Sequence, residues 1–167
     1  MGKVQILAVL TMDGCLSSEL YDKAHQDLCL DRCGLDEIRK KAFYRVTPDY
    51  SISMLHEWRK DCTNIRYLAE ATPDTADYIN GLLRMHAVDE IILYTVPFIS
   101  GSGRHFFKSA LPEQHWTLSS LKSYPNGVCR IIYILDKKQD SQNVRQAYIS
   151  IFRNRINVLI TNNLSRR

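Results

Sequence analysis

A short glycine-rich segment, residues 101–104, is the first place where the sequence suggests chemistry. It reads Gly-Ser-Gly-Arg and follows an apolar run that is typical of a strand. Glycines allow backbone N–H groups to approach an anion closely, and an arginine adds positive charge. The segment has neither the P-loop spacing nor the Gly-x-Gly-x-x-Gly pattern, so an anion-binding loop and a mobile turn are equally good interpretations.

Asp13 is the second candidate for chemistry. It lies in the turn Thr11-Met12-Asp13-Gly14, directly after the apolar run 4–10. A carboxylate at the end of a buried strand can face a ligand or can fix the turn, and the second role is the commoner one. If the site is partly buried, the pKa of this carboxyl rises toward the range that is useful for proton transfer.

Two further groups of residues are candidates for reactive sites. The only metal-like cluster is His25, Cys29 and Cys33; it lacks a second pair of ligands, so ordinary thiols are the preferred interpretation and no metal is expected. Asp89 and Glu90 are adjacent in a predicted strand and point to opposite faces, which favours a structural role at the start of that strand. No Ser-His-Asp or Cys-His hydrolase pattern is present.

The elements that must position these residues alternate between strands and helices. Apolar runs predict strands over 4–10, 64–69 and 88–96. A helix is predicted over 74–86, with Thr72 as its cap ahead of Pro73. The strand–helix–strand unit formed by residues 64–96 predicts two parallel neighbouring strands with a right-handed crossover.

The remaining pattern completes the predicted fold. Helical spacing occurs over 19–30, 35–43 and 51–60, the last with Ser51 as a possible cap, and strands are predicted over 115–123 and 128–135 around an Asn126-Gly127 hairpin turn. The fold class is therefore α/β, with a mixed, mainly parallel sheet, flanking helices and a C-terminal antiparallel hairpin. We expect one domain over 1–136 and a basic amphipathic tail over 137–167.

Composition and charge exclude several classes of protein. With 167 residues, 45% of them hydrophobic and 24% charged, the chain is ordinary for one globular domain and not for a disordered protein. Residues 141–167 hold five arginines and no Asp, Glu or Lys, so this segment contributes +5 to the net charge of +4 and residues 1–140 carry −1. The main body therefore has no electrostatic footprint for nucleic acid.

Hydropathy bears on where the protein acts. No run of eighteen or more apolar residues occurs, and no small-residue cleavage site follows the first apolar run, so we expect no membrane partner, no signal peptide and a cytoplasmic location. The apolar positions of the tail, such as Tyr148 and Phe152, have helical spacing. We expect a docking helix there, with oligomerisation or an arm for an anionic surface or nucleic acid as alternatives.

Several motifs occur in an order that is characteristic of one family. A Leu82-Leu83 helix precedes Val88-Asp89-Glu90 and an apolar strand that ends at Pro97, and Gly101-Ser102-Gly103 and Phe107 follow. The opening strand into Met12-Asp13-Gly14 matches the start of the family, and the Trp116 strand and final hairpin match its end. Over residues 3–18 and 64–135 the chain resembles the reductase domain of the bifunctional riboflavin-biosynthesis protein, the RibD C-terminal domain, which is dihydrofolate reductase-like.

The resemblance implies a fold, an activity and a site. It implies a dihydrofolate reductase-like sheet and an NADPH-dependent reductase similar to 5-amino-6-(5-phosphoribosylamino)uracil reductase, acting on a pyrimidine- or pteridine-type small molecule, and it allows a homodimer. Asp13 would be the catalytic polar group nearest the reacting centre. Substrate would be bound by Thr11, Gly14, Pro97, Gly101, Ser102 and Gly103, and the cofactor by Glu70, Ala71, Thr72 and Thr75.

Residues 70–75 depart from the family pattern. Members usually carry a Gly-Gly pair here, where the backbone approaches the cofactor pyrophosphate at a helix N-terminus. This segment has no glycine, Pro73 lacks an N–H donor, and Glu70 and Asp74 repel phosphate. Residues 19–63 also lack the family's Gly-Arg-x-Thr-like turn. Two functions stay open: an NADPH-dependent reductase with an altered cofactor site, and a non-catalytic relative that has lost NADPH and acts as a binding or interaction module.

Overall fold

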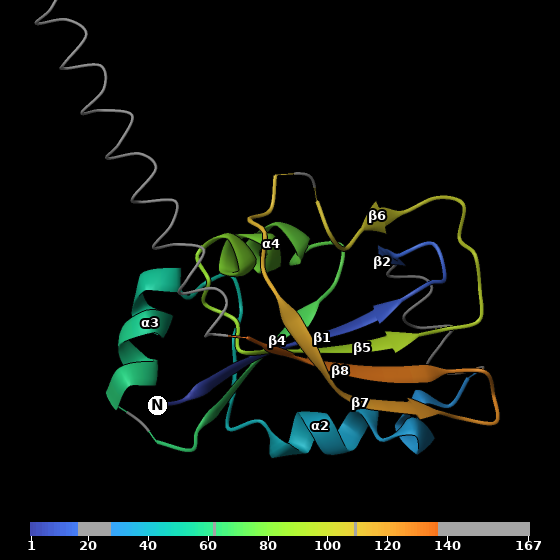
Figure 1. Cartoon of the computed structure of the whole chain (residues 1–167), viewed down its shortest axis with the longest axis horizontal. Helices are drawn as coiled ribbons and strands as arrows, with labels where there is room; N and C mark the ends of the chain where they lie inside the picture. The colour runs from blue at the N-terminus through green and yellow to red at the C-terminus, as the bar shows by residue number, and fades with distance from the viewer. Residues whose placement is uncertain (17–27, 62, 109, 137–167) are drawn as a thin grey trace, which may run out of the picture. The chain divides into compact units, whose positions relative to one another are not determined.

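The computed structural model describes residues 1–16, 28–61, 63–108 and 110–136. A six-stranded mixed sheet forms the centre of this part of the chain, and a two-stranded antiparallel sheet accompanies it (Figure 1). The order across the large sheet is β3 (Tyr44–Arg45), β4 (Arg66–Ala71), β1 (Lys3–Leu10), β5 (Glu90–Thr95), β8 (Cys129–Leu135) and β7 (Trp116–Ser123). The small sheet pairs β2 (Cys15–Leu16) with β6 (Arg104–His105).

The predicted fold class is confirmed. Strands β3, β4, β1 and β5 are parallel, and β8 and β7 add the antiparallel hairpin at one edge. The first strand is buried on both faces, as its continuous apolar content predicts, because it lies in the interior of the sheet with helices on either side.

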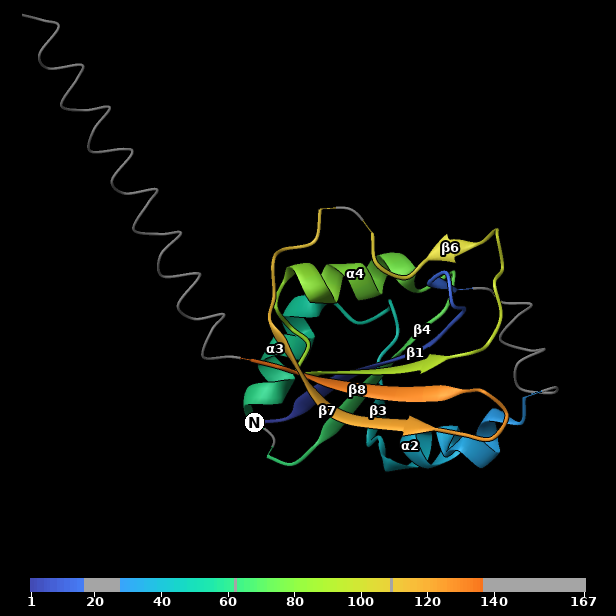
Figure 2. The same cartoon turned by 45° about the vertical axis from the view of Figure 1, so that its right-hand side comes forward.

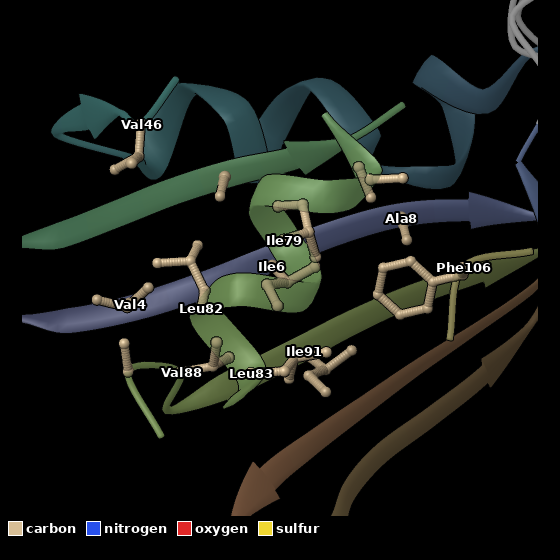
Figure 3. Close-up of a cluster of buried hydrophobic side chains, with 14 of the residues drawn as sticks. Val4, Ile6, Ala8, Val46, Ile79, Leu82, Leu83, Val88, Ile91 and Phe106 are labelled. Carbon is tan, nitrogen blue, oxygen red and sulfur yellow. The ribbon is translucent and has the colours of Figure 1, made fainter. Parts of the chain in front are cut away.

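Helices cover both faces of the sheet. Side chains of α3 (Ile52–Asp61) and α4 (Ala76–Arg84) pack on one face, where Ile79, Leu82 and Leu83 lie over the even-numbered residues of β1 (Figure 3). The short 3-10 helix η1 (Leu30–Cys33) and α2 (Leu35–Lys41) pack on the opposite face, against Leu7 and Val9 (Figure 2). This alternation along β1 follows from the two-residue period of a strand.

One topological prediction was wrong. Strands β4 and β5 are parallel but are not neighbours, because β1 lies between them and pairs with both. Ile6 of β1 stands opposite Ala69 of β4 on one side and Ile91 of β5 on the other. The most apolar strand takes the position that is best shielded from water, so the crossover through α4 spans one strand.

The start of α4 also differs from the prediction. The helix begins at Ala76 with Thr75 as the residue before it, and not after Thr72. The Thr75 hydroxyl donates to the carbonyl of Glu70 (2.7 Å), and the Thr72 hydroxyl accepts from the Thr75 N–H (3.2 Å). These bonds form a turn over residues 72–75, which delays the helix beyond the proline.

The other elements agree with the patterns that predicted them, with three omissions. Ser51 caps α3 by accepting from the Met54 N–H (3.2 Å), and α2 occupies most of the stretch 35–43. The two-residue strands β2, β3 and β6 were not predicted. Most of the predicted helix over 19–30 and all of the tail 137–167 lie outside the described residues. Among the described helices, none is long and apolar enough to cross a membrane.

Candidate functional site

The carboxyl ends of three parallel strands define the candidate site. Strands β4, β1 and β5 all end at the same edge of the sheet, and residues 72–75, 11–14 and 96–103 continue from them. The connection from β1 to β3 passes through α2 on one face of the sheet, and the connection from β4 to β5 passes through α4 on the other. Open α/β sheets bind ligands beyond the carboxyl ends of strands at such a change of direction.

The turn 11–14 and the loop 97–103 are joined directly. The Met12 N–H donates to the carbonyl of Phe98 (2.8 Å). The two carboxylate oxygens of Asp13 accept from the backbone N–H groups of Ser100 (3.2 Å) and Gly101 (3.0 Å). The structure therefore brings Asp13 together with the predicted substrate loop, and each of its two carboxylate oxygens accepts one hydrogen bond from that loop.

Asp13 is kept in its ionised form. A hydrogen bond from the Thr11 side chain, together with weaker ones from the Ser100 and Gly101 N–H groups, holds the pKa of this carboxyl well below its ordinary value and outweighs the desolvation that raises it. The expected upward shift of the Asp13 pKa was wrong, because donors to the carboxylate outweigh burial. At neutral pH this group accepts hydrogen bonds and has no proton to donate.

The other predicted substrate residues shape the backbone. Thr11 is buried, and its hydroxyl accepts from the Cys15 N–H (2.9 Å), while Gly14 has a φ of 76° that closes the turn. Gly103 has a φ of 128°, and a Cβ there would lie 3.3 Å from the Leu16 carbonyl oxygen, so a glycine is needed where β6 meets β2. The Ser102 carbonyl accepts from the Ser100 hydroxyl.

Pro97 faces the C-terminal hairpin. Its Cγ lies 3.0 Å from the position that a Cβ on Gly127 would occupy. The loop 97–103 therefore contacts both the first turn of the chain and the turn between β7 and β8. This contact extends the candidate edge to β8, which the sequence did not place there.

The small sheet adds a cluster that the sequence analysis missed. Pairing of β2 with β6 sets Cys15 opposite His105, with the thiol sulfur 3.8 Å from Nδ1 of the imidazole and 3.7 Å from Asp13 Oδ2. Burial, with the nearby Asp13 charge, raises the pKa of the Cys15 thiol. The thiol therefore stays protonated at neutral pH, which is unfavourable for a cysteine nucleophile.

The predicted cofactor segment makes its polar contacts within the protein. Arg39 of α2 donates two hydrogen bonds to the Glu70 carboxylate, both of 3.1 Å. The Thr72 N–H donates to the Thr75 hydroxyl (2.8 Å), and the Thr75 N–H donates to the Thr72 hydroxyl (3.2 Å). Ala71 is buried in β4. Pro73 has no N–H, so this turn offers a phosphate few free donors.

Arg104 does not supply the missing positive charge at this turn. Its guanidinium donates to the Pro73 carbonyl and pairs with Asp77, which also pairs with Lys108. Asp77 lies in the first turn of α4, where a pyrophosphate would otherwise meet the helix N-terminus. The residues that the family resemblance assigns to the cofactor therefore do not fit a dinucleotide pyrophosphate.

Comparison with solved structures identifies proteins that have a similar fold. No family model matches the sequence, and no curated protein matches it. The structure is similar to a riboflavin biosynthesis protein from Shewanella sp. PV-4, with a TM-score of 0.54 and 10% identity over 81% of this chain and 99% of that one. It is also similar to RibD from Acinetobacter baumannii, with a TM-score of 0.51 and 12% identity over 82% of this chain and 59% of that one. The chain has the dihydrofolate reductase-like fold of these proteins, as the motifs predicted.

Proposed function

We propose that this chain is a ligand-binding protein on a riboflavin-reductase fold, which binds a pyrimidine- or pteridine-type small molecule at the carboxyl edge of its sheet and does not turn over NADPH. The observation that carries the proposal is the turn between β4 and α4. The Thr72 and Thr75 N–H groups are used internally, Pro73 has no N–H, and the carboxylates of Glu70, Asp74 and Asp77 lie along the turn.

Electrostatics at this turn oppose a bound pyrophosphate. Each nearby cation that the structure describes already has an acid partner: Arg39 pairs with Glu70, and Arg104 and Lys108 pair with Asp77. A phosphate would have to displace these partners, and Asp74 would still repel it. The glycine-rich turn that is usual in the family offers free backbone donors, whereas here the Thr72 and Thr75 N–H groups bond within the turn and Pro73 has no N–H.

The ligand-binding part of the proposal rests on the exposed apolar side chains at the same edge. Met12, Phe98 and Ile99 are 64%, 49% and 65% exposed, beside the hydrogen-bonded Asp13. A flat heterocycle can cover such side chains and can hydrogen-bond to the backbone of the joined turn and loop. This arrangement supports a small-molecule partner and does not depend on a reaction.

The second candidate is an NADPH-dependent reductase similar to 5-amino-6-(5-phosphoribosylamino)uracil reductase. The fold likeness to two riboflavin-biosynthesis proteins favours it, as does the meeting of residues 11–14 and 97–103 at the carboxyl edge. A homodimer belongs to this candidate by resemblance, and a cytoplasmic location is expected from the hydropathy of the sequence. It requires the cofactor to bind without the usual contacts at residues 70–75.

Cofactor titration separates the two candidates. We expect NADPH fluorescence to show no saturable change up to millimolar cofactor, and NADPH oxidation with a pyrimidine substrate to stay at the rate without protein. Saturable binding together with oxidation above that rate would replace our proposal by the reductase. As a matched variant, Pro73→Gly/Asp74→Gly restores one donor and removes one negative charge, so NADPH binding should be stronger in it than in the natural chain.

A further inference from the structure

Exposed cations gather where α2 ends and where β4 and β1 begin. Lys40 and Lys41 occupy the last turn of α2, and both are exposed. The chain then joins the edge of the sheet, where the Phe43 N–H donates to the Arg66 carbonyl (2.9 Å). Arg66 lies opposite Lys3 at the start of β1, and both are exposed. Three elements therefore bring their cations to the amino end of the parallel strands.

Three of these side chains leave the same face of the sheet. Paired residues of parallel strands point to the same side, which places Arg66 with Lys3. Phe43 precedes Tyr44, which pairs with the residue after Arg66, so Phe43 comes level with Arg66. This is the face on which α2 packs, because Leu68, two residues after Arg66, belongs to the hydrophobic cluster of η1 and α2.

Two exposed aromatic rings lie beside the cations. Phe43 and Tyr44 are 69% and 50% exposed, and their ring centres are 5.0 Å apart in an edge-on arrangement. The Tyr44 ring stacks on the buried Tyr67, with 5.6 Å between the centres and 14° between the planes. Tyr44 is thereby held in place, and Phe43 beside it presents its ring to a partner outside this part of the chain.

The cations of this region have no acid partners. We name the region the β3-edge surface and define it by Lys3, Lys40, Lys41, Arg45 and Arg66, all exposed, together with Phe43 and Tyr44. Among the described residues, none of its five cations forms an ion pair. Elsewhere in the described chain, five other cations each pair with a carboxylate: Arg39, Arg59, Lys60, Arg104 and Lys108. The β3-edge surface is therefore a place where positive charge is left for an external anion.

We infer that the β3-edge surface binds single-stranded nucleic acid. Unpaired bases stack on aromatic rings, and the phosphates between them attract lysine and arginine. A duplex hides the faces of its bases, so exposed rings among the cations favour a single strand. An acidic peptide would use the cations alone. A membrane surface requires apolar side chains that enter the headgroup layer, whereas the Tyr44 ring is stacked against the sheet.

This surface is separate from the candidate small-molecule site. It lies where the parallel strands begin, and the candidate site lies where they end. The net charge of −1 over residues 1–140 does not exclude it, because a net charge sums over all faces, whereas a phosphate responds to cations within a Debye length of about 10 Å. The inference therefore goes beyond the proposed function, and the failure of one leaves the other intact.

Fluorescence anisotropy with the full chain tests the inference. The probes are a labelled RNA of about twelve nucleotides, the DNA single strand of the same sequence and its duplex. We expect saturable binding of the single strands, tighter than that of the duplex, with a salt dependence of about 0.7 logarithmic units per phosphate contact. Equal binding of RNA and DNA, or a preference for RNA, supports the inference. Absence of saturation at low salt overturns it, as does tighter binding of the duplex, of polyglutamate or of phosphatidylserine vesicles.

A charge variant locates the binding. Lys41→Gln/Arg66→Gln should weaken binding about tenfold and lower the salt dependence by about 1.4 logarithmic units, which corresponds to two phosphate contacts. Arg84→Gln/Lys122→Gln is the matched control, because it also removes one exposed lysine and one exposed arginine, but outside the β3-edge surface. The five arginines of residues 141–167 are the same in both variants. Equal affinity of the two variants would assign the binding to other cations and overturn the inference.

An aromatic variant separates stacking from charge. Phe43→Ala should weaken binding about tenfold without a change in salt dependence, and Phe43→Trp should bind at least as tightly as the natural chain. Phe107→Ala is the matched control, because Phe107 is 51% exposed and packs edge-on against Phe106. Similar affinities of Phe43→Ala and Phe107→Ala would overturn the inference.

A gain in affinity guards against effects of misfolding. Glu37 lies one turn before Lys41 on α2, where its charge opposes a bound phosphate. Glu37→Gln should therefore bind the single strands about twofold to threefold more tightly, which a damaged fold would not do. The thermal unfolding midpoint of each variant is measured beside its affinity. A loss of affinity that always accompanies a lower midpoint, without the gain in Glu37→Gln, would overturn the inference.

Discussion

Asp13 acts as an ionised hydrogen-bond acceptor, and this role predicts how its replacement depends on pH. Asp13→Asn keeps the size of the side chain but loses one acceptor for the N–H groups of Ser100 and Gly101. A carboxyl whose folded-state pKa is lowered contributes stability above its ordinary value of 3.8, and the contribution is lost as pH falls through the folded-state pKa. We expect the variant to be less stable than the natural chain at neutral pH, with a difference that shrinks below about pH 4.

Urea unfolding at several pH values measures this difference. Glu113→Gln is a suitable control, because its side chain is 85% exposed and its removal should have little effect at any of these pH values. A difference between Asp13→Asn and the natural chain that stays constant down to about pH 2 would contradict the assigned role.

For Tyr94 we expect a contribution to stability that is lost as pH rises, in contrast to Asp13. Its ring is fully buried, and this burial, against a smaller effect of the neighbouring Arg130, raises the pKa of the hydroxyl to about 12. The raised value stabilises the fold fully below the ordinary tyrosine pKa of about 10, and this stability is lost as pH rises through the folded-state value. Between about pH 10 and 12, the free energy of unfolding should therefore fall less steeply with pH in Tyr94→Phe than in the natural chain.

The alkaline prediction has an internal control. Tyr124→Phe removes the other hydroxyl that donates to the Cys33 carbonyl, from a side chain that is only half-buried. If Tyr94→Phe and the natural chain lost stability in parallel through this pH range, the buried hydroxyl would not be the group responsible. Circular dichroism followed over a pH series is sufficient for the comparison.

Residue-level prediction from the sequence succeeded where a side chain acts within its own turn. Asp13 was placed in a turn at the end of a buried strand, and the structure shows it closing that turn onto residues 100 and 101. The Cys15–His105 contact was missed because the two residues are 90 positions apart and meet only through two-residue strands. No local periodicity marks such short strands, so only the three-dimensional structure could bring this pair together.

At the scale of elements, a prediction concerns the buried ion pair between Arg59 of α3 and Asp89, the residue directly before β5. Arg59 donates to the Asp89 carboxylate and to the Ala87 carbonyl, and Asp89 also accepts from the Val4 N–H (2.9 Å). Arg59→Leu would leave a buried carboxylate without its cation. We expect a loss of about 3–5 kcal/mol in the free energy of unfolding, measured in urea.

A neighbouring pair on the same helix provides the control. Lys60 and Glu57 are 2.9 Å apart, but both side chains are more than half exposed. Lys60→Gln should therefore change the free energy of unfolding by less than about 1 kcal/mol. An equally small effect of Arg59→Leu would mean that Asp89 is solvated or protonated when its partner is removed.

The elements show which parts of the fold local sequence can specify. Long apolar strands and the amphipathic α4 were predicted because each buries a face that repeats along the chain. The position of β1 between β4 and β5 was not, because its pairing joins residues more than sixty positions apart. Asp89 was correctly assigned a structural role, although its partner Arg59 could not be identified from spacing.

At the scale of the whole molecule, the two faces of the sheet differ in how their charged side chains are paired. The α4 face carries the turn that has lost its fit to a pyrophosphate, with each described cation near it paired to an acid. The η1 face carries two cations of the hairpin that have no acid partner among the described residues. The two faces therefore differ in charge: the described cations near the α4 turn are paired with acids, and Lys122 and Arg130 of the hairpin lie opposite each other on the other face.

The proposed domain boundary at residue 136 leads to a prediction about the whole chain. Residues Met1–Leu135 form a compact unit, and all members of both hydrophobic clusters lie within it. We therefore expect a fragment of residues 1–136 to fold alone, with a cooperative thermal transition and a midpoint within a few degrees of that of the full chain. Its net charge changes from +4 to −2, so the fragment should lose the retention of the full chain on a cation exchanger.

A shorter fragment serves as the control for this boundary. Residues 1–128 lack β8, which pairs with β5 on one side and with β7 on the other, so removal of this strand exposes the apolar edge of β5. That fragment should be unfolded or aggregated, because β7 loses its partner strand and β5 becomes an exposed apolar edge. If the 1–136 fragment behaved in the same way, residues after 136 would be part of the folding unit, and the boundary would have to move toward the C-terminus.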